Sequence, residues 1–292
     1  MSLSRAASAT LSMIVALTVL STPACSGEAS NPEAQPVAKP TEAPSTEKAP
    51  AAAAISIADL QASAQNVTLA PSPAEMQKAM EKAGIANGLS LLVTDRAMKM
   101  DVANKDIIAV RTGVVLADCL LTVKDAPKEK LLARLDQVKG GLLALGAGND
   151  IQVTITELSA QLTNDAISRD DLVKQLDELH GAIIPEIRFE AGERAVPLIQ
   201  AGSWLEGSNL VSSAIITANK PDAGTQLLRQ PDVVDYFLKY VKTEGADKAA
   251  DSVLRQLEGT LNKLKEIAAK PTLTLDDVKD VKAQTDSVLA LL

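Results

Sequence analysis

Apolar side chains recur at spacings of three and four from about residue 71 onward, which is the period of an amphipathic helix. Several breaks in this pattern carry helix-start signals: "SPAE" from Ser72 and "TLDD" from Thr274 are capping sequences, and Pro73 suits a first helical position. The pattern predicts eight longer helices, at 72–84, 104–125, 127–146, 150–164, 168–180, 193–218, 247–269 and from 274 onward. With two shorter pieces at 221–230 and 231–245, we expect an all-α fold, an irregular bundle of about eight to nine helices.

Two details of this pattern are ambiguous. The stretch "IQVTIT" at 151–156 is rich in β-branched residues and also allows a short strand, but no second strand is available to pair with it, so we expect a helix. Pro185 should kink or end the helix that begins after Ser168. The single histidine, His180, is then expected at a helix end on the surface, and one histidine beside acids is a weak metal signal.

Two of the predicted helices are unusually poor in charge. Residues 107–123 carry only Arg111 and Asp118, and residues 195–219 carry only Glu206. Surface helices normally spread charged residues over one face, so helices of this kind are expected at the centre of a bundle. Proline, asparagine and serine in the second helix and the shortness of the first argue against membrane spans.

The few polar groups on these two helices define the candidate site. Arg111 and Asp118 are seven residues apart and share one face, while Glu206, Asn209 and Ser213 form a polar stripe. Buried charges need partners, so we expect Arg111 to bond Glu206, Asp118 or both, with Asn209 and Ser213 completing the network.

Two neighbours of Glu206 refine this picture. Gly202, one turn earlier, would let another helix approach closely, and Trp204 should point to the opposite side as a packing anchor. Three interpretations of these polar side chains remain: a structural network, an exposed stripe without a role, and a ligand or catalytic pocket.

The first residues have the order of an export signal. Arg5 precedes an uncharged apolar run from Ala9 to Leu20, and small residues follow, so residues 1–24 are expected to be a signal peptide. Cys25 is a candidate for lipidation, although cleavage by ordinary signal peptidase is also possible. Residues 25–54 are rich in Pro, Ala and Glu and predict a disordered tether. Residues 55–70 then form a transition to a single helical domain at 71–292.

Composition narrows the function further. Removing residues 1–24 leaves 28 basic and 37 acidic residues and a net charge of −9, which argues against nucleic-acid partners. Membrane contact is expected only through a lipid at Cys25. Apart from Cys25 the only cysteine is Cys119, expected to be a buried free thiol, so neither a disulfide framework nor a zinc site is predicted. No nucleophile–base pair or cofactor fingerprint is recognisable, and we expect no catalytic residues, metal or cofactor.

The segments "AVRTGVVLADCLL" (Ala109 to Leu121) and "AGSWLEGSNL" (Ala201 to Leu210) resemble a loose group of exported bacterial all-helical proteins. Members of that group carry a Gly-Val-x-x-Ala-Asp segment and a later Gly-Trp-[Ile/Leu]-Glu-Gly segment, and the resemblance implies no activity. It implies only that the two segments belong together. We therefore expect a tethered, non-enzymatic protein of the cell envelope, exported to the periplasm or the cell surface, which binds or scaffolds an envelope protein. The alternative is a small-ligand-binding or sensor-like domain with a polar pocket around Glu206.

Overall fold

The structure is a computed structural model that describes residues 70–96, 98–245 and 251–292. All of them belong to the second of two units into which the chain divides, residues 1–53 and residues 54–292. The predicted signal peptide, the lipidation site at Cys25 and the predicted tether lie outside the described residues, as does nearly all of the transition segment.

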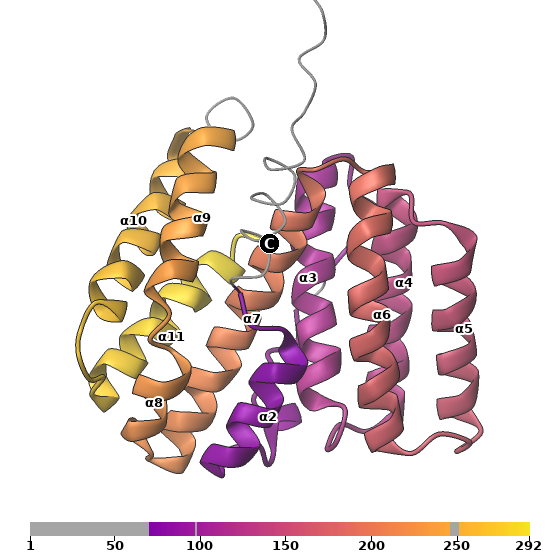
Figure 1. The fold of residues 1–292 in the computed structure, drawn as a ribbon, viewed down its shortest axis with the longest axis horizontal. Coiled ribbons are helices and arrows are strands. Elements are labelled where there is room, and N and C mark those ends of the chain that lie inside the picture. Colours follow the sequence, from indigo (N-terminus) through magenta and orange to yellow (C-terminus); the bar gives the residue numbers. More distant parts are fainter. Residues whose placement is uncertain (1–69, 97, 246–250) are drawn as a thin grey trace, which may run out of the picture. The chain divides into compact units, whose positions relative to one another are not determined.

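The described residues form ten α-helices, one 3-10 helix and no strand (Figure 1). The all-α prediction is therefore confirmed, with ten helices in place of the eight or nine expected. The elements are α2 (Pro73–Ala83), η1 (Leu89–Leu91), α3 (Lys105–Thr122), α4 (Lys128–Leu145), α5 (Asn149–Thr163), α6 (Arg169–Glu190), α7 (Ala195–Ala218), α8 (Pro221–Leu227), α9 (Pro231–Glu244), α10 (Asp251–Ala268) and α11 (Leu275–Leu289).

Local sequence signals explain where several helices begin. Ser72 and Glu75 form the expected capping box at the start of α2, and Thr274 forms one with Asp277 at the start of α11. The side chain of Asn104 accepts hydrogen bonds from the first turn of α3. Helix also prevails over the alternative strand at residues 151–156, which lie inside α5.

Of the two outcomes expected at Pro185, a kink or an end of the helix, the end does not occur, because α6 continues through this residue to Glu190. Pro185 lacks one backbone donor, but Leu179, Ile183 and Ile187 remain buried on one face of the helix. Burial of that face on both sides of the proline stabilises the continuous helix. His180 consequently lies inside α6 and is only partly exposed, not at a helix end.

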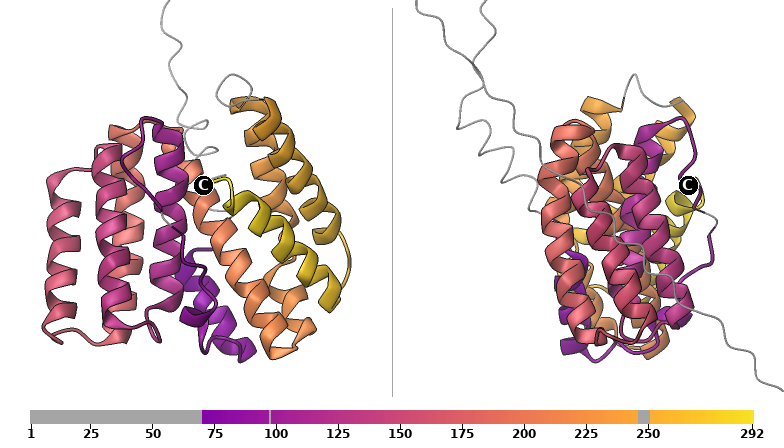
Figure 2. Two further views of the ribbon diagram at one scale, coloured as in Figure 1. Left: turned by 180° about the vertical axis from the view of Figure 1, so that it is seen from behind. Right: turned by 90° about the vertical axis from the view of Figure 1, so that its right-hand side faces the viewer.

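Helices α3 and α7 form the centre of this unit, as their low charge predicts. Buried residues run without a break from Thr112 to Thr122 in α3 and from Gly202 to Ile215 in α7. The two helices make the most extensive contact in the structure. Helix α4 packs on the other side of α3, and α11 packs on α7; α5 lies beyond α4, while α9 and α10 pack together beyond α7 (Figures 1 and 2). Among the described residues, no helix is long and apolar enough to cross a membrane.

Two glycines allow α3 and α7 to pack backbone against backbone. A Cβ atom on Gly113 would lie 1.9 Å from the carbonyl oxygen of Ile199, and one on Gly202 would lie 2.0 Å from that of Val110. The hydroxyl of Ser203 donates to the carbonyl oxygen of Gly113 at 2.9 Å and ties the helices together at the same point. The close approach predicted for Gly202 is thus confirmed, and it brings Glu206 against α3.

Candidate functional site

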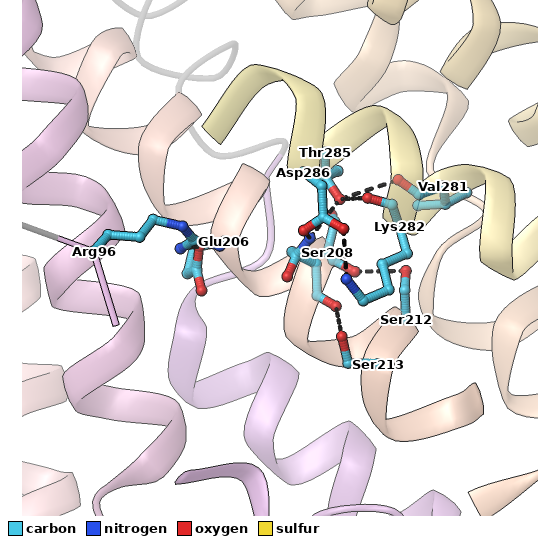
Figure 3. A network of polar contacts seen from close by, with 10 residues as sticks. Arg96, Glu206, Ser208, Ser212, Ser213, Val281, Lys282, Thr285 and Asp286 are labelled. Carbon is cyan, nitrogen blue, oxygen red and sulfur yellow. Dashed lines mark hydrogen bonds and ion pairs between the residues drawn. The ribbon is translucent and has the colours of Figure 1, made fainter. Parts of the chain in front are cut away.

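Glu206 lies one turn after Gly202 and is completely buried. Its Oε2 accepts a hydrogen bond of 2.6 Å from Nη1 of Arg96, and this ion pair is itself largely shielded from solvent (Figure 3). Arg96 belongs to the segment between η1 and α3, which has no regular secondary structure at that point. A buried carboxylate requires such a cation, because an unpaired charge would cost far more than the pairing.

The predicted pairing of Arg111 with Glu206 or Asp118 is wrong. The Nε of Arg111 donates to the main-chain oxygen of Leu292 at 2.7 Å, and Nη2 donates to the same oxygen. Its Nη1 donates to the main-chain oxygen of Lys99 at 2.7 Å. Main-chain oxygens after the last turn of α11 have no hydrogen-bond donor within the helix, and the guanidinium of Arg111 supplies donors to one of them. The sequence pattern gives no sign that Arg111 lies beside this segment.

Asp118 does lie beside Glu206, as predicted, and the two side chains are within hydrogen-bonding reach. Oδ1 of Asp118 and Oε1 of Glu206 are buried, and neither has a donor when both groups are ionised. If Asp118 is protonated, its hydroxyl can donate a hydrogen bond to the carboxylate of Glu206, so that a single proton provides for both oxygens. Burial, followed by the negative charge of Glu206, raises the pKa of Asp118 well above its ordinary value. Burial also raises the pKa of Glu206, but Arg96 opposes that change. We therefore assign the proton to Asp118.

Asn209 and Ser213 do not complete this network. The Nδ2 of Asn209 donates to Oγ1 of Thr285 at 3.0 Å and to Oδ1 of Asp286 at 2.7 Å, which links α7 to α11. The hydroxyl of Ser213 donates to the main-chain oxygen of Asn209, within α7 itself. The polar stripe of α7 therefore serves two neighbours: Glu206 faces Arg96 and Asp118, and Asn209 faces α11.

Trp204 lies on the opposite side of α7, as predicted, and it packs there as an anchor. Its side chain is 5% exposed, its ring centroid is 5.4 Å from that of Phe237, and its Nε1 donates to Oε1 of Gln230 at 2.8 Å. Trp204 also borders a cavity of about 520 Å³ between α3, α7, α9, α10 and α11.

The cavity beside Trp204, which we call the apolar pocket, has a mainly apolar wall and one polar end. Its inner wall is formed mainly by aliphatic and aromatic side chains, including Leu205, Phe237 and Leu261. Its polar lining gathers where α3 and α7 begin and α9 ends, chiefly at Asn104, Asp106, Arg194 and Tyr240. Two exposed apolar side chains, Ile107 and Leu291, also border it.

An ion pair fixes the polar end of the apolar pocket. Nη2 of Arg194 lies 2.9 Å from Oδ2 of Asp106, and this hydrogen-bonded pairing raises the pKa of Arg194. The guanidinium carbon of Arg194 also lies 5.9 Å from the ring centroid of Tyr240. Burial raises the pKa of Tyr240 to about 12, so its hydroxyl stays protonated and donates to the main-chain oxygen of Arg194.

A second hollow, of about 410 Å³, lies beside Asp118 on the α4 side of α3. It shares no lining residue with the apolar pocket. Arg96, Lys130 and Arg134 contribute cationic side chains to it, and Asp95 and Asp118 contribute acids. We call it the Asp118 hollow. It reaches the buried polar centre through Asp118, whereas Glu206 does not line it.

The chemistry of the remaining candidate side chains is limited. Cys119 is a free thiol buried in α3, as expected, and burial raises its pKa to about 12. Burial lowers the pKa of His180. Within residues 70–96, 98–245 and 251–292, no group of three His, Cys, Asp or Glu side chains is placed to hold a metal ion. The arrangement is suited to holding a molecule, through one apolar cavity and one charged hollow.

Comparison with protein-family models, with curated proteins and with solved structures found no match to the chain. The resemblance to exported helical proteins therefore stays a prediction. Arg96 and the apolar pocket are the features that the sequence analysis missed. Arg96 lies in an irregular stretch, 110 residues from Glu206, where periodicity carries no signal. The pocket is formed by five helices that only the fold brings together.

Proposed function

We propose that this chain is an exported, non-enzymatic binding protein whose helical body holds an amphiphile in the apolar pocket. The amphiphile is a molecule with a hydrocarbon body and one polar end. The observation that carries the proposal is a cavity of about 520 Å³ with a mainly apolar inner wall and a cluster of polar groups at one end. Small-molecule sites in proteins have this size and this division between apolar lining and a few polar groups.

The two ends of the pocket define the chemistry of the proposed ligand. Leu205, Phe237 and Leu261 offer only apolar surface, which favours a hydrocarbon chain. At the other end, Asn104 and the ion pair of Arg194 with Asp106 offer donors and acceptors for a polar group. Ile107 and Leu291, exposed at the edge of the same pocket, would be covered by such a ligand.

The only tryptophan of the chain, Trp204, gives a direct assay of this pocket. We expect a dibrominated stearate to quench Trp204 fluorescence saturably in the purified protein, because bromine quenches at contact. Ala201→Phe places a ring into the pocket from α7 and should weaken the apparent affinity at least about tenfold, the factor that corresponds to about 1.4 kcal/mol. Leu198→Phe, at another lining residue that is partly exposed, is the second variant if Ala201→Phe does not fold.

Ala218→Phe is the matched control, since Ala218 is exposed at the end of α7 and does not line the pocket. It should leave quenching unchanged, and circular dichroism checks that each variant is folded. Absence of saturable quenching in the wild type would refute the proposal. Equal quenching in folded Ala201→Phe and Leu198→Phe would show that the stearate binds elsewhere.

The export part of the proposal is supported by the order of charge, apolar run and small residues in the first 24 positions. We propose that Cys25 is acylated and that residues 25–54 tether the helical body to a membrane. Metabolic labelling with a fatty-acid analogue tests this: the label should appear on the wild type and disappear in Cys25→Ala. An unlabelled wild-type protein that is nevertheless cleaved after residue 24 would indicate ordinary signal peptidase processing.

A further inference from the structure

The Asp118 hollow contains an arginine whose charge has no direct counterion. Arg134, on α4, is 7% exposed, and its Nη1 donates to Oγ1 of Thr122 at 3.0 Å. Among the described residues, no carboxylate lies within ion-pair distance of Arg134. Guanidinium groups keep their proton in proteins, so this side chain holds a buried positive charge that a neutral hydroxyl only partly stabilises.

Among the neighbouring acids, Asp118 is near enough for the charge of Arg134 to lower its pKa, against the larger effect of burial, but the two side chains form no ion pair. Arg96 is already paired with Glu206 at 2.6 Å. Asp118 and Glu206 lie side by side, and each has one buried oxygen without a donor, so a proton on one carboxyl group could form a hydrogen bond to the other. With that proton on Asp118, the pair carries one negative charge, which Arg96 balances. One positive charge, that of Arg134, is then left over beside the hollow.

A second cation on α4 lies on the same face. Lys130 is one turn before Arg134, and Gln137 is one turn after it, so the three side chains form a row along the wall of the hollow. Nζ of Lys130 is 3.7 Å from Oδ1 of Asp95, and both side chains are about half or more exposed. A surface pair of that length contributes little, so Lys130 is available to another anion.

We propose that the Asp118 hollow binds a small oxyanion, a carboxylate or a phosphate group, between Arg134 and Lys130, with the amide of Gln137 as a further donor. Arginine presents two parallel N–H groups that match the oxygens of either anion. Asp95 at the rim and the net charge of −8 of the chain disfavour a large polyanion, which limits the ligand to a small one. The site is separate from the apolar pocket and does not depend on it.

The test measures the melting temperature of the purified protein against increasing inorganic phosphate, acetate or chloride at constant ionic strength. A ligand that binds only the folded state raises the melting temperature with its concentration. We expect a rise that grows with the logarithm of the phosphate or acetate concentration and that chloride does not produce, and the more effective anion identifies the ligand class. Lys130→Met, at a half-exposed position, should weaken the apparent affinity at least about tenfold.

Two further variants on the same helix complete the design. Arg134→Met should abolish the rise while leaving the protein folded, because replacing a buried unpaired charge by an apolar chain of similar length removes a cost. Lys139→Met is the matched control: Lys139 donates to Thr156 on α5, away from the hollow, and its loss should leave the rise unchanged. The proposal is overturned by a wild type that responds to neither anion beyond chloride, or by a full response in Lys130→Met.

Discussion

The single charge on α7, at Glu206, is retained because the structure surrounds it with partners. Arg96 neutralises one of its oxygens, and Asp118 on α3, whose pKa burial raises, lies beside it and can supply a proton to the other. Trp204, two positions earlier, points into the apolar pocket on the opposite side of the helix. Neighbouring residues thus serve two environments, a buried polar centre and an apolar cavity, because successive positions on a helix face in different directions.

The proton between Asp118 and Glu206 makes stability depend on pH in a defined direction. The pKa of Asp118 is raised in the folded protein, so the folded state binds a proton that the unfolded chain has released above its ordinary pKa of 3.8. The free energy of unfolding should therefore fall as pH rises from about 4 toward the raised pKa. One such proton corresponds to a slope of about 1.4 kcal/mol per pH unit.

Asp118→Asn isolates this effect. The amide of asparagine can donate to Oε1 of Glu206 without titrating, so the variant should keep the bond and lose that part of the slope. Urea unfolding of both proteins between pH 4 and pH 8 measures the difference, and contributions from groups that do not interact with Asp118 cancel in the comparison. If the two proteins show the same pH dependence, Asp118 is ionised in the folded state and our proton assignment is wrong.

Individual side-chain partners were the part of the site that sequence reasoning predicted least well. It selected Asp118 and Glu206 correctly, because a lone charge in a buried helix must be paired. It chose Arg111 as their partner, since Arg111 is the only cation within residues 107–123 and 195–219. The actual partner, Arg96, comes from an irregular segment, and pairing across such a distance depends on the path of the chain between helices.

At the scale of the helices, sequence and structure agree closely where the determinants are local. The caps at Ser72 and Thr274 are formed as expected, because a side chain needs to reach only two or three residues along the chain. Whether Pro185 ends its helix could not be decided from the sequence, for the opposite reason. Its effect depends on how firmly both halves of α6 are packed, and that packing is tertiary.

The contact between α3 and α7 should depend strongly on Gly202. In Gly202→Ala, the new methyl group would lie 2.0 Å from the carbonyl oxygen of Val110 and 3.0 Å from the backbone nitrogen of Val114, so the helices must separate. Overpacking of this kind costs about 1–3 kcal/mol, or more where backbone is involved. For a unit of this size, that corresponds to a fall in melting temperature of roughly 2–12 °C.

Gly140→Ala is the matched control for that substitution. Gly140 lies inside α4, and a Cβ atom there would meet nothing within 4 Å. Alanine is the better helix former by about 0.5–1 kcal/mol, so this variant should melt slightly higher than the wild type. A Gly202→Ala protein that melts like the wild type would mean that the two helices are not packed backbone to backbone.

At the scale of the molecule, the positions of the two cavities depend on which helices pack against one another. The apolar pocket takes its wall from five helices between residues 104 and 292, and the Asp118 hollow takes its wall from α3, α4 and the segment before α3. Periodicity predicts that each helix has an apolar face, but it does not determine which faces leave a gap between them. The all-α architecture was predictable from the sequence, whereas the candidate ligand sites were not.

The most direct measurement of the central claim is the position of a bound bromine atom. A crystal of the protein grown with dibrominated stearate, measured at the bromine absorption edge, locates the hydrocarbon chain independently of fluorescence. Our account predicts anomalous bromine density inside the apolar pocket, between Trp204 on α7 and Leu261 on α10. Bromine density only on the outer surface, with the space beside Trp204 closed by protein side chains, would contradict it.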